Sequence, residues 1–300
     1  MAQESAHSGI VVGVDGSPES NAAVAWAARA AAMRGARLTL IHALTDPSAA
    51  AWLDVPVPAD YWPPDYWGVQ RAKAADLLAD ATRIASQALP DPSTITVEQE
   101  LTAGGAVAPL VEWSKAAEMV VVGCRGRGGL QKILLGSVSS GLVHRAHCPV
   151  AVIHDEAALK DRSADAPVVV GIDGSPASEH AVEVAFGEAS RRELELVALH
   201  TWLESSDDFI GAGWPNVQAR ADEILAERLA GWQERYPDVV VRRVVKMDNP
   251  IHQLLELSKS AQLLVVGSHG RGGIAGLILG SVSSAVVQRV QIPVIVARRP

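Results

Sequence analysis

The chain alternates between short, continuous apolar runs and longer stretches in which apolar residues recur with helical spacing. The runs are rich in β-branched residues, which is typical of strands covered on both faces. They lie at residues 10–14, 38–42, 119–123 and 149–153, and again at 168–172, 196–200, 263–267 and 293–297, and further strands with more polar residues are expected near 94–101 and 239–246. Helices are predicted at 70–88, 106–117 and 138–147, at 217–234 and 250–260, and after the Ser-Pro pairs at 17–18 and 175–176. Strands that alternate with helices predict an α/β fold with parallel, doubly wound sheets.

The two halves of the chain repeat one another. The motif Gly-x2-Gly-x9-Gly-Ser occurs at residues 123–137 and again at 267–281, and residues 120–154 and 264–298 are identical at 18 of 35 positions. Each half also begins with the same pattern, Gly-Val-Asp-Gly-Ser-Pro from Gly13 and Gly-Ile-Asp-Gly-Ser-Pro from Gly171. The chain is therefore an internal duplication. We expect domains at 9–154 and 167–298, joined by a polar linker at 155–166.

The composition narrows the class of protein. Three hundred residues, of which 48% are hydrophobic, are enough for two domains with separate cores. A net charge of −8 argues against a general nucleic-acid or anionic membrane surface, and no apolar stretch reaches the length of a membrane helix. The two cysteines, Cys124 and Cys148, form neither a disulfide framework nor a CxxC metal site, so we expect a reduced, cytoplasmic protein with no metal site of its own.

The repeated motifs fall where ligands bind in such sheets, outside the carboxyl ends of the strands. The loop after residue 123 leads through several glycines to Gly136-Ser137, which opens a helix whose backbone N–H groups can hold phosphate oxygens. Ser137 and Ser139 can add hydroxyl donors, and Arg127 can neutralise a phosphate charge. Asp15, at the end of the first strand, is an acceptor suited to ribose hydroxyls or to a metal held by phosphates. Together these residues predict a nucleotide site.

Glycines between a strand and a helix can also serve only to make a tight turn. Two observations favour a binding site over that interpretation. The glycine spacing recurs identically in both halves while the surrounding residues differ, and an aspartate closes the first strand in each half, at Asp15 and Asp173.

With these motifs, and with Pro-Val-x-Val at the end of each half, the chain resembles the universal stress protein family of the ATP-binding type, in its tandem two-domain form. The resemblance implies two five-stranded sheets of strand order 3-2-1-4-5, the adenine nucleotide alpha hydrolase-like fold, with ATP bound by each domain and a regulatory role in stress adaptation or growth control. We expect Mg²⁺ or Mn²⁺ on the phosphates. The implied nucleotide residues are Gly13, Val14, Asp15, Ala43, Val122, Gly123, Gly126, Arg127, Gly136, Ser137, Val138 and Ser139 in the first half, and Gly171, Ile172, Asp173, Thr201, Val266, Gly267, Gly270, Arg271, Gly280, Ser281, Val282 and Ser283 in the second.

Several features leave two interpretations open. Cys124 lies inside the glycine loop, where Arg125 and helix N–H groups can lower the pKa of a thiol, but a passive small residue is the favoured interpretation. His42 and His200 end equivalent strands and are interpreted as hydrogen-bonded residues at the core edge. The segment 46–68 holds five aromatic residues among five prolines, which favours a lid or interface over packing on the neighbouring domain.

Assembly and function are the remaining hypotheses. The two closing strands, 149–153 and 293–297, are short apolar edges that we expect to pair with each other, giving an intrachain pseudo-dimer, and we expect a homodimer of chains. The favoured function is a nucleotide-dependent regulatory module without a catalytic residue. The alternative is an adenylating or ATP-hydrolysing enzyme of the related α/β group, although the chain lacks a GxxxxGK[ST] loop. The protein that such a module would regulate is not identified by the sequence.

Overall fold

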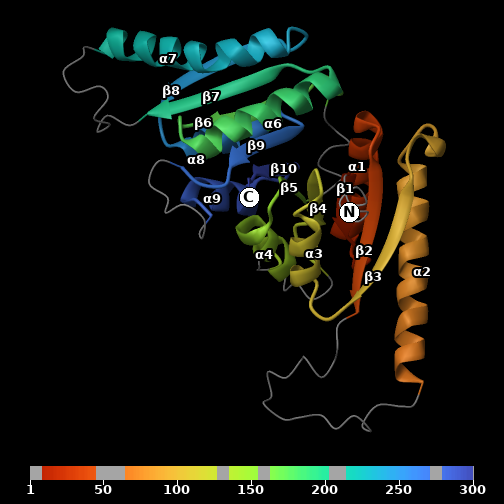
Figure 1. The fold of residues 1–300 in the computed structure, drawn as a ribbon. Coiled ribbons are helices and arrows are strands. Elements are labelled where there is room, and N and C mark those ends of the chain that lie inside the picture. The colour runs from red at the N-terminus through yellow and green to blue at the C-terminus, as the bar shows by residue number, and fades with distance from the viewer. Residues whose placement is uncertain are drawn as a thin grey trace, which may run out of the picture. The chain divides into compact units, whose positions relative to one another are not determined.

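A computed structural model describes residues 9–44, 65–126, 135–154, 163–202, 214–270 and 279–299. Contacts within the chain divide it into two compact units, Met1–Cys148 and Pro149–Pro300. Figure 1 shows the helices and strands of each unit.

Unit 1 is a parallel sheet covered by helices. Its elements are β1 (Gly9–Gly13), α1 (Pro18–Arg34), β2 (Arg37–Leu44), α2 (Tyr66–Gln87), a 3₁₀ turn (Pro92–Thr94), β3 (Val97–Ala103), α3 (Val107–Trp113), β4 (Met119–Gly123) and α4 (Ser137–Arg145). The strand order is β3-β2-β1-β4, and every pairing in it is parallel. Helix α1 packs on α2, and α3 packs on α4 (Figure 1). The order reverses between β1 and β4, so the carboxyl ends of these two strands form the switch point of the sheet.

Unit 2 has the same arrangement of strands and helices, with a fifth parallel strand, β10. Its elements are β5 (Val150–Ile153), β6 (Val168–Ile172), α6 (Pro176–Arg192), β7 (Leu196–Trp202), α7 (Trp214–Arg235), β8 (Val241–Met247), α8 (Pro250–Ser258), β9 (Leu263–Gly267), α9 (Ser281–Arg289) and β10 (Val294–Ala297). The parallel strands have the order β8-β7-β6-β9-β10, which confirms the expected 3-2-1-4-5 arrangement. Strand β5 pairs antiparallel with β10, with Ala151 opposite Ile295. The predicted pairing of the two closing strands is therefore confirmed.

The first helix of each unit begins as its sequence predicts. The side chain of Ser17 accepts a hydrogen bond from the backbone N–H of Ser20, and Pro18 follows it at the first helical position. Ser175 and Ser178 form the same cap in α6. Helix α1 ends at Gly35, whose φ of 59° is the left-handed conformation that glycine adopts without a steric cost.

The boundaries of the edge strands were predicted less well. The structure begins β3 at Val97, whereas the sequence predicts its start near residue 94. The carboxylate of Asp91 accepts hydrogen bonds from the N–H and the hydroxyl of Ser93, which stabilises a 3₁₀ turn over the preceding residues. The capped turn thus includes Thr94, which the prediction had placed in the strand.

The cores consist mainly of small and branched aliphatic side chains. The central strands β1, β4, β6 and β9 are almost completely buried, as their uninterrupted apolar runs predict. Alanines fill much of α1, which allows that helix to lie close to the sheet. Within the described residues, no helix combines the length and the apolar character that crossing a membrane requires.

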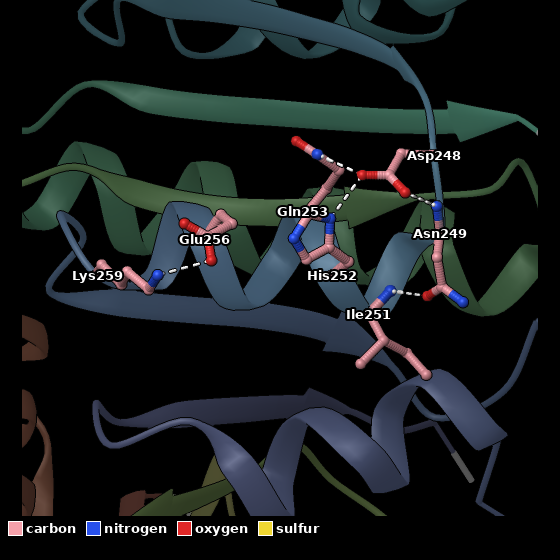
Figure 2. A network of polar contacts seen from close by, with 7 residues as sticks. All are labelled: Asp248, Asn249, Ile251, His252, Gln253, Glu256 and Lys259. Carbon is pink, nitrogen blue, oxygen red and sulfur yellow. Dashed lines mark hydrogen bonds and ion pairs between the residues drawn. The ribbon is translucent and has the colours of Figure 1, made fainter.

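Helix α8 begins with a network of polar side chains (Figure 2). In α3 the N-cap residue is Ala106, and no side chain caps that helix. The Asp248 carboxylate accepts hydrogen bonds from Gln253 Nε2 and His252 Nδ1, each at 2.6 Å, and from the backbone N–H of Asn249. These bonds, chiefly the one from Gln253, lower the pKa of Asp248 to about 2. The hydrogen bond to Asp248 in turn raises the pKa of His252, as do the carboxylates of Asp248 and Glu256, whereas burial and the ammonium of Lys259 oppose the shift.

We expect this network to make stability depend on pH in two opposite directions. The His252 contribution is complete below about pH 6.5 and is lost as the pH rises through the raised pKa of the folded state. The Asp248 contribution is present above about pH 3.9 and is lost as the pH falls through about 2. NMR titration of His252 should give a pKa above that of a free histidine, and Asp248→Asn should lower it. An unchanged midpoint in Asp248→Asn would show that Asp248 does not cause the shift.

Candidate functional site

The turn after β1 holds Asp15 in a defined orientation. Its Oδ1 accepts hydrogen bonds from the backbone N–H of Ser17 at 2.9 Å and from the Ser17 hydroxyl at 2.6 Å. The same hydroxyl caps α1, so the carboxylate and the start of the helix are coupled. The other carboxylate oxygen, Oδ2, lies against Gly126 so closely that a Cβ there would collide with it. Asp15 therefore connects the first strand, the first helix and the glycine loop.

Unit 2 builds this turn in the same way. Asp173 Oδ1 accepts from the N–H and hydroxyl of Ser175 at 2.9 and 2.7 Å. A Cβ at Gly270 would lie 2.5 Å from Asp173 Oδ2. The two units therefore share this geometry although their loop residues differ.

The loop after β4 returns directly onto the end of that strand. The N–H of Gly136 donates to the carbonyl of Cys124 at 2.7 Å, and the Ser139 hydroxyl donates to the same carbonyl at 2.9 Å. In unit 2, Gly280 donates to Ser268 at 2.8 Å, and the Ser283 hydroxyl donates to the carbonyl of Gly267 at 2.5 Å. Ser139 is only 1% exposed, so its hydroxyl ties the loop together.

Helices α4 and α9 begin without a side-chain cap. Gly136 and Gly280 are their N-cap residues, and neither helix has a hydrogen bond from a capping side chain. Ser137 and Ser281, the first helical residues, are exposed. An uncapped helix start beside a glycine loop presents backbone N–H groups and the positive end of the helix dipole, an arrangement that accepts an anion.

The ends of β2 and β7 form another side of each site. His42 Nδ1 donates to the carbonyl of Val14 at 2.7 Å, and His200 Nδ1 donates to that of Ile172 at the same distance. These bonds confirm the interpretation of both histidines as hydrogen-bonded residues at the core edge. Ala43 and Thr201 follow them directly, near the carboxyl ends of strands that neighbour β1 and β6.

The structure brings most of the expected nucleotide residues together at the switch point of each sheet. Those located there are Gly13, Val14, Asp15, Ala43, Val122, Gly123, Gly126, Gly136, Ser137, Val138 and Ser139 in unit 1, and Gly171, Ile172, Asp173, Thr201, Val266, Gly267, Gly270, Gly280, Ser281, Val282 and Ser283 in unit 2. Arg127 and Arg271 lie outside the described residues, as do most of the aromatic segment and residues 155–162 of the expected linker.

Sequence reasoning did not assign Ser17 and Ser175 to the site. Both were interpreted only as helix caps, yet each also orients the aspartate two residues before it. The Asp-x-Ser spacing could have predicted this role, because Asp side chains commonly accept a hydrogen bond from the backbone N–H two residues further on.

The two glycine loops differ chemically. In unit 1, Arg125 forms an ion pair of 3.2 Å with Glu19 on α1. In unit 2, His269 takes the place of Arg125 and shares a hydrogen bond of 2.9 Å with the Ser268 hydroxyl. Ser268 stands in the position of Cys124, which is 1% exposed, and burial raises the pKa of the Cys124 thiol although Arg125 opposes the shift. The structure thus favours the passive interpretation of Cys124, because reactive thiols have lowered pKa values and are accessible.

The chemistry available at each switch point is that of a binding site. It offers backbone donors at a helix start, a fixed carboxylate oxygen and buried aliphatic strand ends. Among the described residues, no group of three or more His, Cys, Asp or Glu side chains could hold a metal ion. This combination defines a tandem doubly wound α/β protein with an uncapped helix start at the switch point of each sheet.

Comparison with known proteins identifies the family. The model of the universal stress protein family matches residues 8–154 and 166–298, so the chain belongs to that family. Universal stress protein Rv2623 of Mycobacterium tuberculosis is 50% identical over 291 residues, which cover 97% of this chain and 96% of that protein. Universal stress protein Mb2028c of Mycobacterium bovis is 51% identical over 293 residues, with 97% of both chains covered.

A solved structure shares the fold along the whole chain. A universal stress protein from Archaeoglobus fulgidus superposes with a TM-score of 0.71, covering 98% of this chain and 99% of that one at 23% identity. The family model thus matches two segments of the chain, and the shared fold covers both of them, as a tandem two-domain protein requires.

The glycine at the end of β4 is expected to be structural. A Cβ at Gly123 would lie 2.7 Å from the backbone carbon of Glu19, so Gly123→Ala must push the strand away from α1. We expect a loss of roughly 1–3 kcal/mol of stability, the usual cost of overpacking. Urea unfolding measures it, with Gly105→Ala as the control because its Cβ would meet open space. Equal unfolding midpoints for the two variants would contradict a packing role for Gly123.

Proposed function

We propose that each unit binds one ATP molecule and that the chain acts as a nucleotide-dependent regulatory module in stress adaptation or growth control. One observation carries this proposal. In both units an aspartate has one oxygen fixed by a helix cap and the other directed at a glycine of the loop, beside a helix that starts without a cap. A tight turn alone would not require the same arrangement in both units.

The described residues fit the parts of ATP. The N–H groups at the start of α4, from Ser137 and Val138, suit the phosphates, and Gly126 and Gly136 themselves carry no side chain that would block them. Asp15 suits the ribose hydroxyls, since a carboxylate oxygen is a strong acceptor. ATP would bring the Mg²⁺ or Mn²⁺ that its own phosphates hold. The same roles fall to Ser281, Val282 and Asp173 and their neighbours in unit 2.

A regulatory role accords with the state of the ionisable groups at the site. Asp15 Oδ1 is engaged with Ser17, and His42 donates to a backbone carbonyl, so both side chains already serve the architecture. Neither is placed as a general base for phosphate chemistry, which requires direct or one-water contact with the attacking group. We therefore propose a binding protein of the cytoplasm, acting as a homodimer, over an ATP-hydrolysing enzyme.

The proposal predicts two ATP molecules per chain. Purified full-length protein should release adenine nucleotide on denaturation, and calorimetry on the stripped protein should give a stoichiometry near two, because both units keep the arrangement. A preference for GTP, or a single site, would contradict the two-site proposal. Turnover that matches the rate of nucleotide exchange would favour the enzyme.

Asp15→Asn tests the role of the carboxylate with little disturbance of the fold. Asparagine keeps an oxygen that can accept from Ser17, so the cap of α1 survives while the charge is lost. We expect ATP binding at that unit to weaken by about 1 to 3 kcal/mol, the range for hydrogen bonds to charged groups. Asp173→Asn should do the same in unit 2. Ser17→Ala is the control, because it removes the cap and keeps the carboxylate. Weaker binding in Ser17→Ala alone would return Asp15 to a purely structural role.

A further inference from the structure

A histidine on α6 contacts the segment that follows β10. His180 Nε2 lies 3.0 Å from the carbonyl oxygen of Arg298, and His180 Nδ1 lies 3.1 Å from Oε2 of Glu183, one turn further along the helix. Nη2 of Arg299 pairs with the same Glu183 oxygen at 2.6 Å. The imidazole is only 13% exposed, so these two contacts replace most of its hydrogen bonds with water. Two side chains of α6 thus hold the two residues after β10.

Both ring nitrogens of His180 face groups that only accept hydrogen bonds. A carbonyl oxygen has no proton to donate. Burial opposes the ionisation of Glu183, but the hydrogen bonds and charges of His180 and Arg299 outweigh burial and lower the pKa of that carboxyl, so it is a carboxylate at neutral pH. A neutral imidazole has one N–H group, whereas an imidazolium has two. The two contacts are therefore both hydrogen bonds only when His180 is protonated.

The first helix of the other half carries different residues at the corresponding positions. Helices α1 and α6 have the same length and the same Ser-Pro start, and their alignment places Ala22 and Ala25 where α6 has His180 and Glu183. Both alanines are buried. A helix at this place can therefore pack on its sheet without a histidine, and His180 adds a contact that depends on its charge.

The groups around His180 are mostly apolar. Helix α6 packs on β6, β9 and β10, whose buried residues are aliphatic or glycine. It also packs on α7, which gives His180 neither a hydrogen bond nor an ion pair in the described part of the chain. The charged groups placed with it are Glu183 on its own helix and the guanidiniums of Arg298 and Arg299 after β10. Glu183 favours the imidazolium, whereas the guanidiniums oppose it.

We propose that His180 is a pH-sensitive clamp, which holds the segment after β10 on α6 as an imidazolium and releases that segment when it loses its proton. None of the residues expected to bind nucleotide takes part, so the clamp is independent of the proposed ATP sites. Strand β10 is the strand that pairs with β5, so the clamp makes the end of that strand sensitive to pH near neutrality.

The direction of the pH dependence follows from the two partners. The clamp is complete while His180 is protonated and Glu183 is ionised. It is lost as the pH rises through the titration of the imidazole, which free histidine undergoes near pH 6.5. It is lost again in acid, as the pH falls through the lowered pKa of Glu183.

NMR of the full chain between roughly pH 5.5 and 8.5, a range that spans the titration of a histidine, tests the proposal. Nitrogen shifts of the His180 ring report its protonation, and solvent exchange at the amides of Arg298 and Arg299 reports the segment, after correction for the intrinsic pH dependence of exchange. We expect the amides to open roughly two- to tenfold more often once His180 is neutral, the effect of losing about one hydrogen bond. Equal protection on both sides of the His180 titration would overturn the clamp.

His180→Ala is the matched variant, because α1 folds with Ala22 at the corresponding place. We expect its Arg298 and Arg299 amides to exchange fast and, after correction, at the same rate across the pH range. His252→Ala is the control, because His252 is an exposed histidine on α8, and its loss should leave the pH dependence unchanged. A dependence that persists in His180→Ala, or that vanishes in His252→Ala, would overturn His180 as the group that senses pH.

Discussion

The bond between the aspartate that follows the first strand and the serine that caps the first helix is the interaction on which each site depends. Asp15 Oδ1 accepts from Ser17, whose hydroxyl also receives the N–H of Ser20. A single carboxylate oxygen thus fixes the strand end to the helix start. Because that oxygen is held, the direction of the other is set, and it lies against Gly126 of the glycine loop.

The glycines of the repeat have different tasks, although the motif presents them alike. Gly123 is required because the backbone of Glu19 occupies the space of a Cβ. Gly126 is required because Asp15 does. At Gly136 a Cβ would lie 3.3 Å from the carbonyl oxygen of Cys124, so this residue lets the loop close on its own strand. Only the second of these tasks bears directly on the proposed ligand, and the other two hold the loop that surrounds it.

The two units keep one architecture and differ in the chemistry at its margins. The loop of unit 1 carries Arg125, balanced by Glu19, where unit 2 carries His269. Gly16 in the turn of unit 1 lines a cleft beside α2, and the guanidinium of Arg228 lies against Gly174 in the turn of unit 2. The polar network at the start of α8 stands where unit 1 has two glycines. A duplicated chain can diverge in this way because the side chains that differ are not those whose hydrogen bonds shape the loop.

The sequence by itself determined the elements and the duplication, since apolar runs, Ser-Pro caps and repeated glycines act locally or recur at fixed spacing, whereas the strand order came from the resemblance to a known family. It also identified the glycine loops and the two aspartates that gather at the switch points, because parallel strands bring their carboxyl ends to one edge, and the family resemblance added the other residues. Tertiary structure alone decided which oxygen of Asp15 is engaged, that burial outweighs Arg125 in setting the pKa of Cys124, and that Arg228 reaches Gly174. These outcomes depend on distances between segments far apart in the chain. The sequence names the residues that meet at these places, but it does not give the distances between their atoms, and those distances decide which contacts form.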